Sequence, residues 1–137
     1  ISVAAWTVCG LAIANALVFI FINLQLLFRD NIVNAYRIIG AVNVYLLMAL
    51  VGALTLEVIH AATGVSIGGN VLLSGKDDDY AQFIYFSLAS LTTVGFGDIH
   101  AVNASSRMLA TFLSTVGVLF PAIVIARLVG LAASQKS

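Results

Sequence analysis

Three long stretches of this chain carry almost no charged side chain, and they limit its possible folds more than any other feature. Residues 2–28 and 108–126 contain no charge, and residues 38–59 contain only Glu57. A helix rises about 1.5 Å per residue, so about 20 apolar residues cross the hydrocarbon core of a bilayer. The sequence therefore predicts an all-α membrane protein with three spanning helices.

The composition agrees with this prediction. Hydrophobic residues make up 61% of the 137 residues and charged residues 9%, whereas about 25% of a soluble domain is charged. We therefore expect contact with a lipid bilayer. The formal net charge is zero, so we expect no nucleic-acid partner. Cys9 is the single cysteine of the sequence, and it is predicted to be a small buried apolar side chain.

The first stretch is interpreted as a membrane helix rather than a secretory signal. Residues 12–14 weakly resemble a cleavage site, but the stretch lacks the basic start and the short apolar run of a signal peptide. Only residues 29–37 separate it from the second stretch. The two helices are therefore expected to form an antiparallel hairpin.

A polar segment and a short apolar segment follow the second stretch. Residues 63–79 are rich in Gly, Asn and Ser and contain the run Lys76-Asp77-Asp78-Asp79, which predicts an exposed loop whose carboxylates cap the next helix. Residues 80–91 suit a short buried helix but cannot cross a bilayer. Such a re-entrant helix requires the non-helical backbone after it to be enclosed by protein or to line a watery cavity.

The next seven residues are Thr92-Thr93-Val94-Gly95-Phe96-Gly97-Asp98. Glycine at alternate positions permits positive φ angles, so successive carbonyl oxygens can point to one side and replace the water around a cation. A Gly-x-Gly alone would be unspecific, but the whole run lies between a short aromatic segment and a long apolar one. A glycine-containing turn between two membrane helices is the alternative interpretation.

This run resembles the signature sequence of potassium channels, Thr-Val-Gly-Tyr-Gly-Asp, with Phe96 at the tyrosine position. In that family four such loops form rings of backbone oxygens around the ion. The resemblance covers roughly residues 38–132 and implies a homotetramer with K⁺ as the permeant ion. It implies a pore domain over 38–137, made of an outer helix 38–62, an outer loop 63–79, a pore helix 80–91, a filter 92–98 and an inner helix 106–133. Residues 1–37 are expected to form an N-terminal transmembrane helix and its cytoplasmic connection.

Carried over by position, the resemblance implies that four consecutive residues bind K⁺ through their carbonyl oxygens, and the first of them also through its hydroxyl: Thr93, Val94, Gly95 and Phe96. It implies that five others support the filter: Thr92, Gly97, Asp98, Tyr85 and Phe86. Tyr85 stands where relatives have a tryptophan that donates toward the acid closing the filter, so we expect it near Asp98. Ala89 stands where some relatives have a carboxylate, and Ala101 stands where a proline is usual.

The last stretch contains the residues expected to take part in gating. Gly117 follows Gly97 by twenty positions, the spacing at which the family often has a hinge glycine. Pro121 removes a helix hydrogen bond and bends the axis. The resemblance implies gating by movement of this helix, and a static packing kink is the alternative. The sequence has no helix with arginine at every third position, which voltage sensing would require.

The distribution of charge predicts the orientation. The acidic run and His100 fall on one face of the membrane, and four basic residues fall on the other: Arg29, Arg37, Arg127 and Lys136. Excess Lys and Arg mark the cytoplasm, so we expect a multi-pass protein of the cell membrane with an extracellular filter mouth and a cytoplasmic inner-helix end. His100 has two interpretations. Its protonation would add positive charge at the filter mouth and reduce cation entry, or it has no role in conduction. A cytoplasmic regulatory domain outside this sequence is a further expected partner.

The sequence favours a passive K⁺-selective pore. A weakly selective cation channel and a non-conducting membrane scaffold subunit are the alternatives. An enzyme is not expected, because the membrane segments contain no acid and base pair, no nucleophile beside a histidine and no metal-ligand spacing. No organic cofactor is expected.

Overall fold

The computed structural model describes residues 3–29, 35–71, 73 and 78–134. The described elements are, in chain order, α1 (Val3–Arg29), α2 (Ala35–Thr63), β1 (Ile67–Gly69), α3 (Asp78–Leu91), β2 (Ile99–Ala101) and α4 (Ala104–Ser134). The predicted all-helical membrane fold is confirmed, with a small sheet in addition. Lys76, Asp77 and Lys136, to which the sequence analysis gave places in the outer loop and at the cytoplasmic end, lie outside the described residues.

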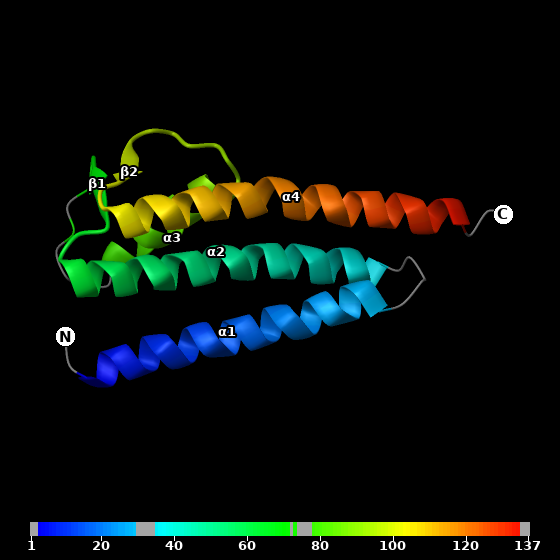
Figure 1. The fold of residues 1–137 in the computed structure, drawn as a ribbon, viewed down its shortest axis with the longest axis horizontal. Coiled ribbons are helices and arrows are strands. Elements are labelled where there is room, and N and C mark those ends of the chain that lie inside the picture. The colour runs from blue at the N-terminus through cyan, green and yellow to red at the C-terminus, as the bar shows by residue number, and fades with distance from the viewer. Residues whose placement is uncertain (1–2, 30–34, 72, 74–77, 135–137) are drawn as a thin grey trace.

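Three of the described helices are long and apolar enough to cross a membrane, and their candidate spans are Thr7–Leu27, Tyr36–Thr63 and Ala104–Leu131. Figure 1 shows α1 and α4 on either side of α2, with α2 antiparallel to both. Many of their large apolar side chains are exposed in the single chain. Such a surface suits lipid or further protein chains rather than water.

The short helix α3 packs against both α2 and α4, near the end of the bundle that carries the sheet (Figure 1). Gly52 of α2 allows this close approach, because a Cβ there would overlap the Ser87 hydroxyl and crowd Leu113. Ser87 is fully buried, and its hydroxyl donates to the Ala49 carbonyl at 2.7 Å. This contact between α2 and α3 holds α3 at one height along the bundle.

The C-terminal end of α3 meets α4 about halfway along the span of α4. The Ser114 hydroxyl donates to the Ser90 carbonyl at 2.9 Å, and a Cβ at Gly117 would overlap the Leu91 carbonyl. Both α4 residues lie near the middle of the span Ala104–Leu131. The short helix therefore ends at about mid-membrane depth and does not cross.

The two strands bring the chain back to the end of the bundle from which α3 started. They are antiparallel, with Ile67 opposite Ala101 and Gly69 opposite Ile99. Because β1 follows α2 closely and β2 follows residues 92–98, the segment between them is re-entrant, as predicted. The interpretation of residues 63–79 as an exposed loop is wrong at Ser66, Ile67 and Asp79, which are buried. Ile67 pairs with Ala101 and packs in the core beside α3, and Asp79 belongs to the first turn of α3.

The helix limits around the sheet have local causes. Gly64 ends α2 with a φ of 79°, and its N–H donates to the His60 carbonyl at 2.8 Å, as glycine does at helix C-termini. Asn103 caps α4 by accepting from the Ser106 N–H at 2.8 Å. The Asn103 amide also donates to the Val65 carbonyl at 2.6 Å. The start of α4 is thereby joined to the segment that leads into β1.

Candidate functional site

Residues 92–98 form a loop that stands out from the bundle on the opposite side of the view from α1 (Figure 1). Positive φ angles occur at every second residue, with 59° at Thr93, 52° at Gly95 and 82° at Gly97. Glycine adopts such angles without steric cost, whereas Thr93 is a β-branched residue in a conformation that it rarely takes. The alternation that the two glycines predicted is therefore present and extends to Thr93.

Four consecutive carbonyl groups of this loop accept no hydrogen bond from the described part of the chain. Across the described part of the chain, the carbonyl oxygens of Thr93, Val94, Gly95 and Phe96 accept none, and all four residues are exposed. An unsatisfied backbone group costs several kcal/mol in hydrocarbon, on the order given by transfer measurements. These oxygens therefore require water, a cation or another chain as a partner.

The end of α3 holds the loop from below through backbone hydrogen bonds. The N–H of Thr93 donates to the Ser90 carbonyl at 3.1 Å, and the N–H of Gly95 donates to the Ala89 carbonyl at 3.2 Å. The last carbonyl groups of a helix have no partner within the helix. In this chain they bind the loop and orient its first residues.

Two hydroxyl groups from neighbouring helices complete this support. Tyr45 of α2 donates to the Leu91 carbonyl at 3.1 Å, and Ser114 of α4 donates to the Ser90 carbonyl. The sequence analysis missed both supports. A hydroxyl inside a membrane span needs a partner, and that rule would have marked Tyr45 and Ser114 as candidates, although it names no acceptor.

Asp98 holds the other end of the loop. The Tyr85 hydroxyl donates to Asp98 Oδ2 at 2.8 Å, which confirms the predicted proximity of these residues. The hydrogen bond to Asp98 raises the pKa of the Tyr85 hydroxyl. The Tyr85 ring also stacks on Phe96 with centroids 6.0 Å apart. Asp98 Oδ1 accepts from the Ile99 N–H at 2.9 Å.

The end of β1 and the residue after it also support the Asp98 end of the loop, and the sequence analysis missed this contact. The Asn70 N–H donates to the Asp98 carbonyl at 2.9 Å, and a Cβ at Gly69 would overlap the same oxygen. The segment after α2 therefore closes on the end of the loop. The neighbouring glycines Gly68 and Gly69 were a signal of close backbone approach, but the sequence did not identify the partner.

The remaining predicted residues lie at different distances from the loop. Phe86 is buried in the core beside α3, and Thr92 begins the loop with its hydroxyl on the Leu88 carbonyl at 2.7 Å. Gly117 touches the base of the loop through Leu91. Pro121 lies farther along α4, which continues as a helix through it.

An open hollow of about 460 Å³ lies between the loop, α3 and α4. Gly95 and Gly97 line it together with Phe86, Ala110 and Thr111. Among the described residues, no group of three or more His, Cys, Asp or Glu side chains could hold a metal ion. The oxygen ligands that this site offers are backbone carbonyl and hydroxyl groups, and oxygen ligands suit hard cations.

Replacing Tyr85 with phenylalanine is expected to loosen the loop without unfolding the bundle, because only the hydroxyl that binds Asp98 is lost. We expect several-fold faster hydrogen exchange at the amides of residues 94–99. Exchange measured by mass spectrometry on the purified protein checks this. The control is Tyr36→Phe at the exposed start of α2. This substitution should leave exchange at residues 94–99 unchanged. Equal exchange in the two variants would mean that the Tyr85 hydroxyl contributes nothing to the loop.

Comparison with protein families finds one whose description is "Ion channel", and its model matches residues 44–133. The matched region begins in α2, contains α3, the loop and both strands, and ends in α4. It does not include α1. Comparison with curated proteins and with solved structures finds no match.

Proposed function

The chain belongs to this ion channel family, and from that premise we propose that it conducts K⁺ selectively through a pore made by four copies. Ion channels are a transporter class without enzymatic activity, which confirms the prediction that the protein is not an enzyme. The family and the three candidate spans place the protein in a membrane. K⁺ as the permeant ion, the tetramer, the filter residues and the orientation belong to the proposal.

The observation that carries the proposal is the row of four carbonyl oxygens without hydrogen bonds, from Thr93 to Phe96. They follow a helix that ends at mid-membrane depth. Backbone hydrogen bonds to the end of α3 hold the start of the loop, and the Tyr85–Asp98 hydrogen bond holds its end. Rings of such oxygens can replace the hydration shell of K⁺. The Thr93 hydroxyl would add an oxygen at the inner end.

The requirement for four copies follows from the exposure of the loop. One chain supplies one side of an oxygen ring, and non-helical backbone at membrane depth must be buried in protein or line a watery cavity. The Phe96 side chain is 69% exposed in the single chain. The hollow beside the loop is open, so a neighbouring copy can cover both. Contacts of this kind would place the α4 helices of the four copies around a central cavity and each α1 toward the lipid.

Charge supports an orientation with the loop mouth outside the cell. Three described arginines, Arg29, Arg37 and Arg127, lie at the end of the bundle away from the sheet. The end that carries the sheet has one described arginine, Arg107, together with Asp79 and Asp98. Basic residues accumulate on the cytoplasmic side. We therefore place the end of α4 in the cytoplasm, where its movement would open and close the pore.

The test uses purified full-length chain in liposomes and in planar bilayers. We expect K⁺ flux down its gradient, a bi-ionic reversal potential that favours K⁺ over Na⁺, and a chemical cross-linking ladder that stops at four copies. Equal permeability to K⁺ and Na⁺ would contradict selectivity. Flux of neither ion would contradict conduction and leave the scaffold interpretation.

A weakly selective cation channel is the second candidate, and one observation favours it. On the outer side of the loop, Phe96 is held by ring stacking on Tyr85 without a hydrogen bond. A ring contact tolerates sliding more than a directional bond does. The reversal potential distinguishes the two candidates.

A further inference from the structure

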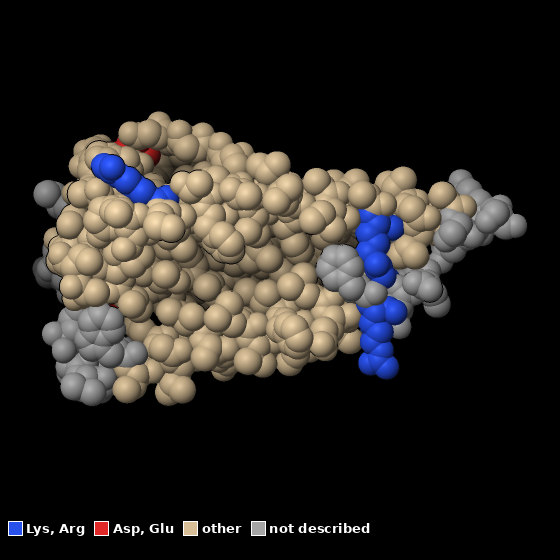
Figure 2. All heavy atoms as spheres, in the orientation of Figure 1, with Lys and Arg blue, Asp and Glu red and all other residues tan. Residues whose placement is uncertain are grey.

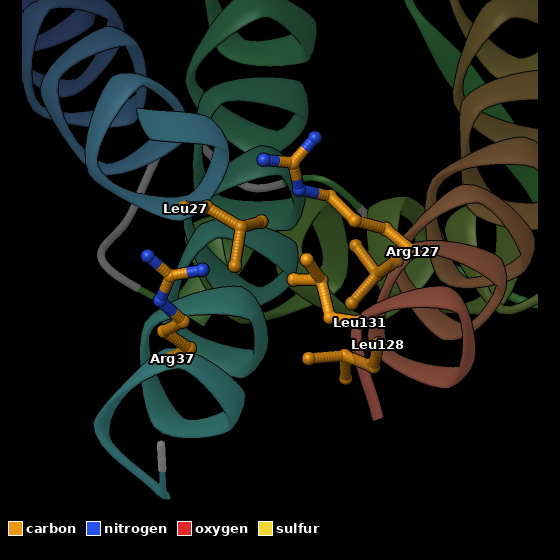
Figure 3. A pocket seen from close by; sticks show the side chains of 6 residues that line it. Leu27, Arg37, Arg127, Leu128 and Leu131 are labelled. Atoms are coloured by element: carbon orange, nitrogen blue, oxygen red, sulfur yellow. The ribbon is translucent and has the colours of Figure 1, made fainter. Parts of the chain in front are cut away.

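At the end of the bundle away from the sheet, the three long helices enclose a small pocket that the proposed conduction does not use. Its lining residues come from α1, α2 and α4: Leu27, Arg37, Val124, Arg127, Leu128 and Leu131. Figure 3 shows the side chains of Arg37 and Arg127 extending from α2 and α4 into the gap between the helices, with Leu27 of α1 between them in this view. Two cationic side chains therefore border one apolar patch.

The pocket lies where the apolar spans end. Leu27 is the last residue of the first candidate span, Tyr36 is the first of the second, and Leu131 is the last of the third. Arg37 and Arg127 are therefore at or within about one helical turn of the boundary between hydrocarbon and headgroups. Half-buried arginines at this depth extend their guanidinium groups toward the headgroups.

The charge of this end is basic. Arg29 lies at the end of α1 and is exposed, while the described acidic residues belong to the other half of the bundle: Glu57, Asp78, Asp79 and Asp98. Figure 2 shows basic side chains over this end, and no acidic side chain is visible there on the face shown. The potential at this end therefore favours an anion.

We propose that this pocket is a binding site for an anionic phospholipid of the cytoplasmic leaflet. The phosphate group binds between Arg37 and Arg127, and an acyl chain lies along Leu128 and Leu131. An amphipathic ligand matches a lining of two guanidinium groups and four apolar side chains, whereas a free anion would gain nothing from the leucines. Guanidinium groups bind phosphate through paired N–H donors.

The size of the pocket determines where the headgroup lies. The enclosed volume is about 10 Å³, which is room for roughly one water molecule. The phosphate therefore lies at the mouth, against the ends of the side chains, and not inside. A guanidinium group has five N–H donors, so an arginine with a partner in its own chain can still bind a phosphate oxygen.

The consequence concerns α4 and depends on the proposed function. A phosphate held by Arg37 and Arg127 links the cytoplasmic end of α4 to α2. If α4 moves in gating, the lipid favours the arrangement in which the two arginines are close together.

The test measures lipid binding directly, without ion flux. The purified full-length chain in detergent is titrated with phosphatidylglycerol, or with phosphatidylcholine of the same acyl chains, and bound lipids are counted by native mass spectrometry. We expect the wild-type chain to bind phosphatidylglycerol about tenfold more tightly. Arg37→Gln and Arg127→Gln should each remove most of this preference, a loss of about tenfold. Arg127→Lys, which keeps the charge, should retain part of it.

Arg29→Gln is the matched control, because it removes the same charge at the same end from a residue that does not line the pocket. It should change affinity less than about twofold, as exposed charges do. An equal loss in Arg29→Gln would show a diffuse basic surface and overturn the site. Displacement of the lipid by inorganic phosphate at matched concentration would overturn the lipid in favour of a soluble anion. Circular dichroism verifies that each variant is folded. If a glutamine variant does not fold, Arg127→Lys still tests the site. A chain that binds lipid but passes no K⁺ would contradict the proposed conduction alone.

Discussion

Replacing Gly95 with alanine is expected to abolish K⁺ conduction while the helices still fold. Gly95 has a φ of 52° and no atom within 4 Å of a built Cβ in the single chain, so the cost arises from the backbone angle. A residue with a Cβ loses about 1–2 kcal/mol in this conformation. Four copies would lose on the order of 4–8 kcal/mol, which lowers the population of the conducting filter about a thousandfold or more.

The measurement is K⁺ flux into liposomes at matched protein content, with cross-linking to count copies. Gly64→Ala is the control, because Gly64 also has a positive φ, of 79°, and nothing within 4 Å of a built Cβ. It lies outside the loop at the end of α2, so the backbone cost is similar but conduction should persist. Normal flux in Gly95→Ala would contradict the assignment of the filter.

Replacing Gly117 with alanine has the second largest expected effect. An added Cβ would overlap the Leu91 carbonyl, so α4 must move away from the end of α3. Overpacking of this kind costs about 1–3 kcal/mol, which exceeds the gain of up to about 1 kcal/mol from replacing glycine inside a helix. We expect lower thermal stability of the purified protein and, because Leu91 adjoins the loop, a lower open probability.

Gly130→Ala is the matched control on the same helix. A Cβ at Gly130 meets nothing within 4 Å in the single chain, so this substitution should stabilise α4 slightly and leave single-channel behaviour unchanged. The comparison also separates the two interpretations of Gly117. A hinge predicts altered open probability at unchanged stability, whereas the contact with Leu91 predicts that both fall. Unchanged stability in Gly117→Ala would contradict the packing role.

The sequence was sufficient for the membrane class, the three spans and the short helix, because each depends on local properties. A charge-free stretch of sufficient length predicts a span wherever it lies, and residues 80–91 were too short for one. The same local rule predicted positive φ at Gly95 and Gly97, since the preference belongs to glycine itself. The contact between Tyr85 and Asp98 came from the family resemblance and not from residue properties.

The features of the fold and of the site that the sequence did not predict depend on contacts between residues distant in the chain. The pairing of β1 with β2 was missed because strands of three residues show no measurable alternation. The acceptor of the Tyr45 hydroxyl is the Leu91 carbonyl, and no property of Tyr45 specifies it. Gly117 was interpreted as a hinge from its spacing, whereas the structure adds a steric reason for glycine that only the position of α3 reveals.

The contact between Gly117 and Leu91 also restricts how α4 can move. Rotation of α4 about its own axis at this height would bring the side chain of Val116 or Val118 against the Leu91 carbonyl, where even a methyl group does not fit. The half of α4 before this point is tied to Ser90 through Ser114, whereas Pro121 and the following residues lie beyond it. The contact therefore acts as a fixed pivot, and bending of the distal half, without twist at its base, is the motion that the sterics permit.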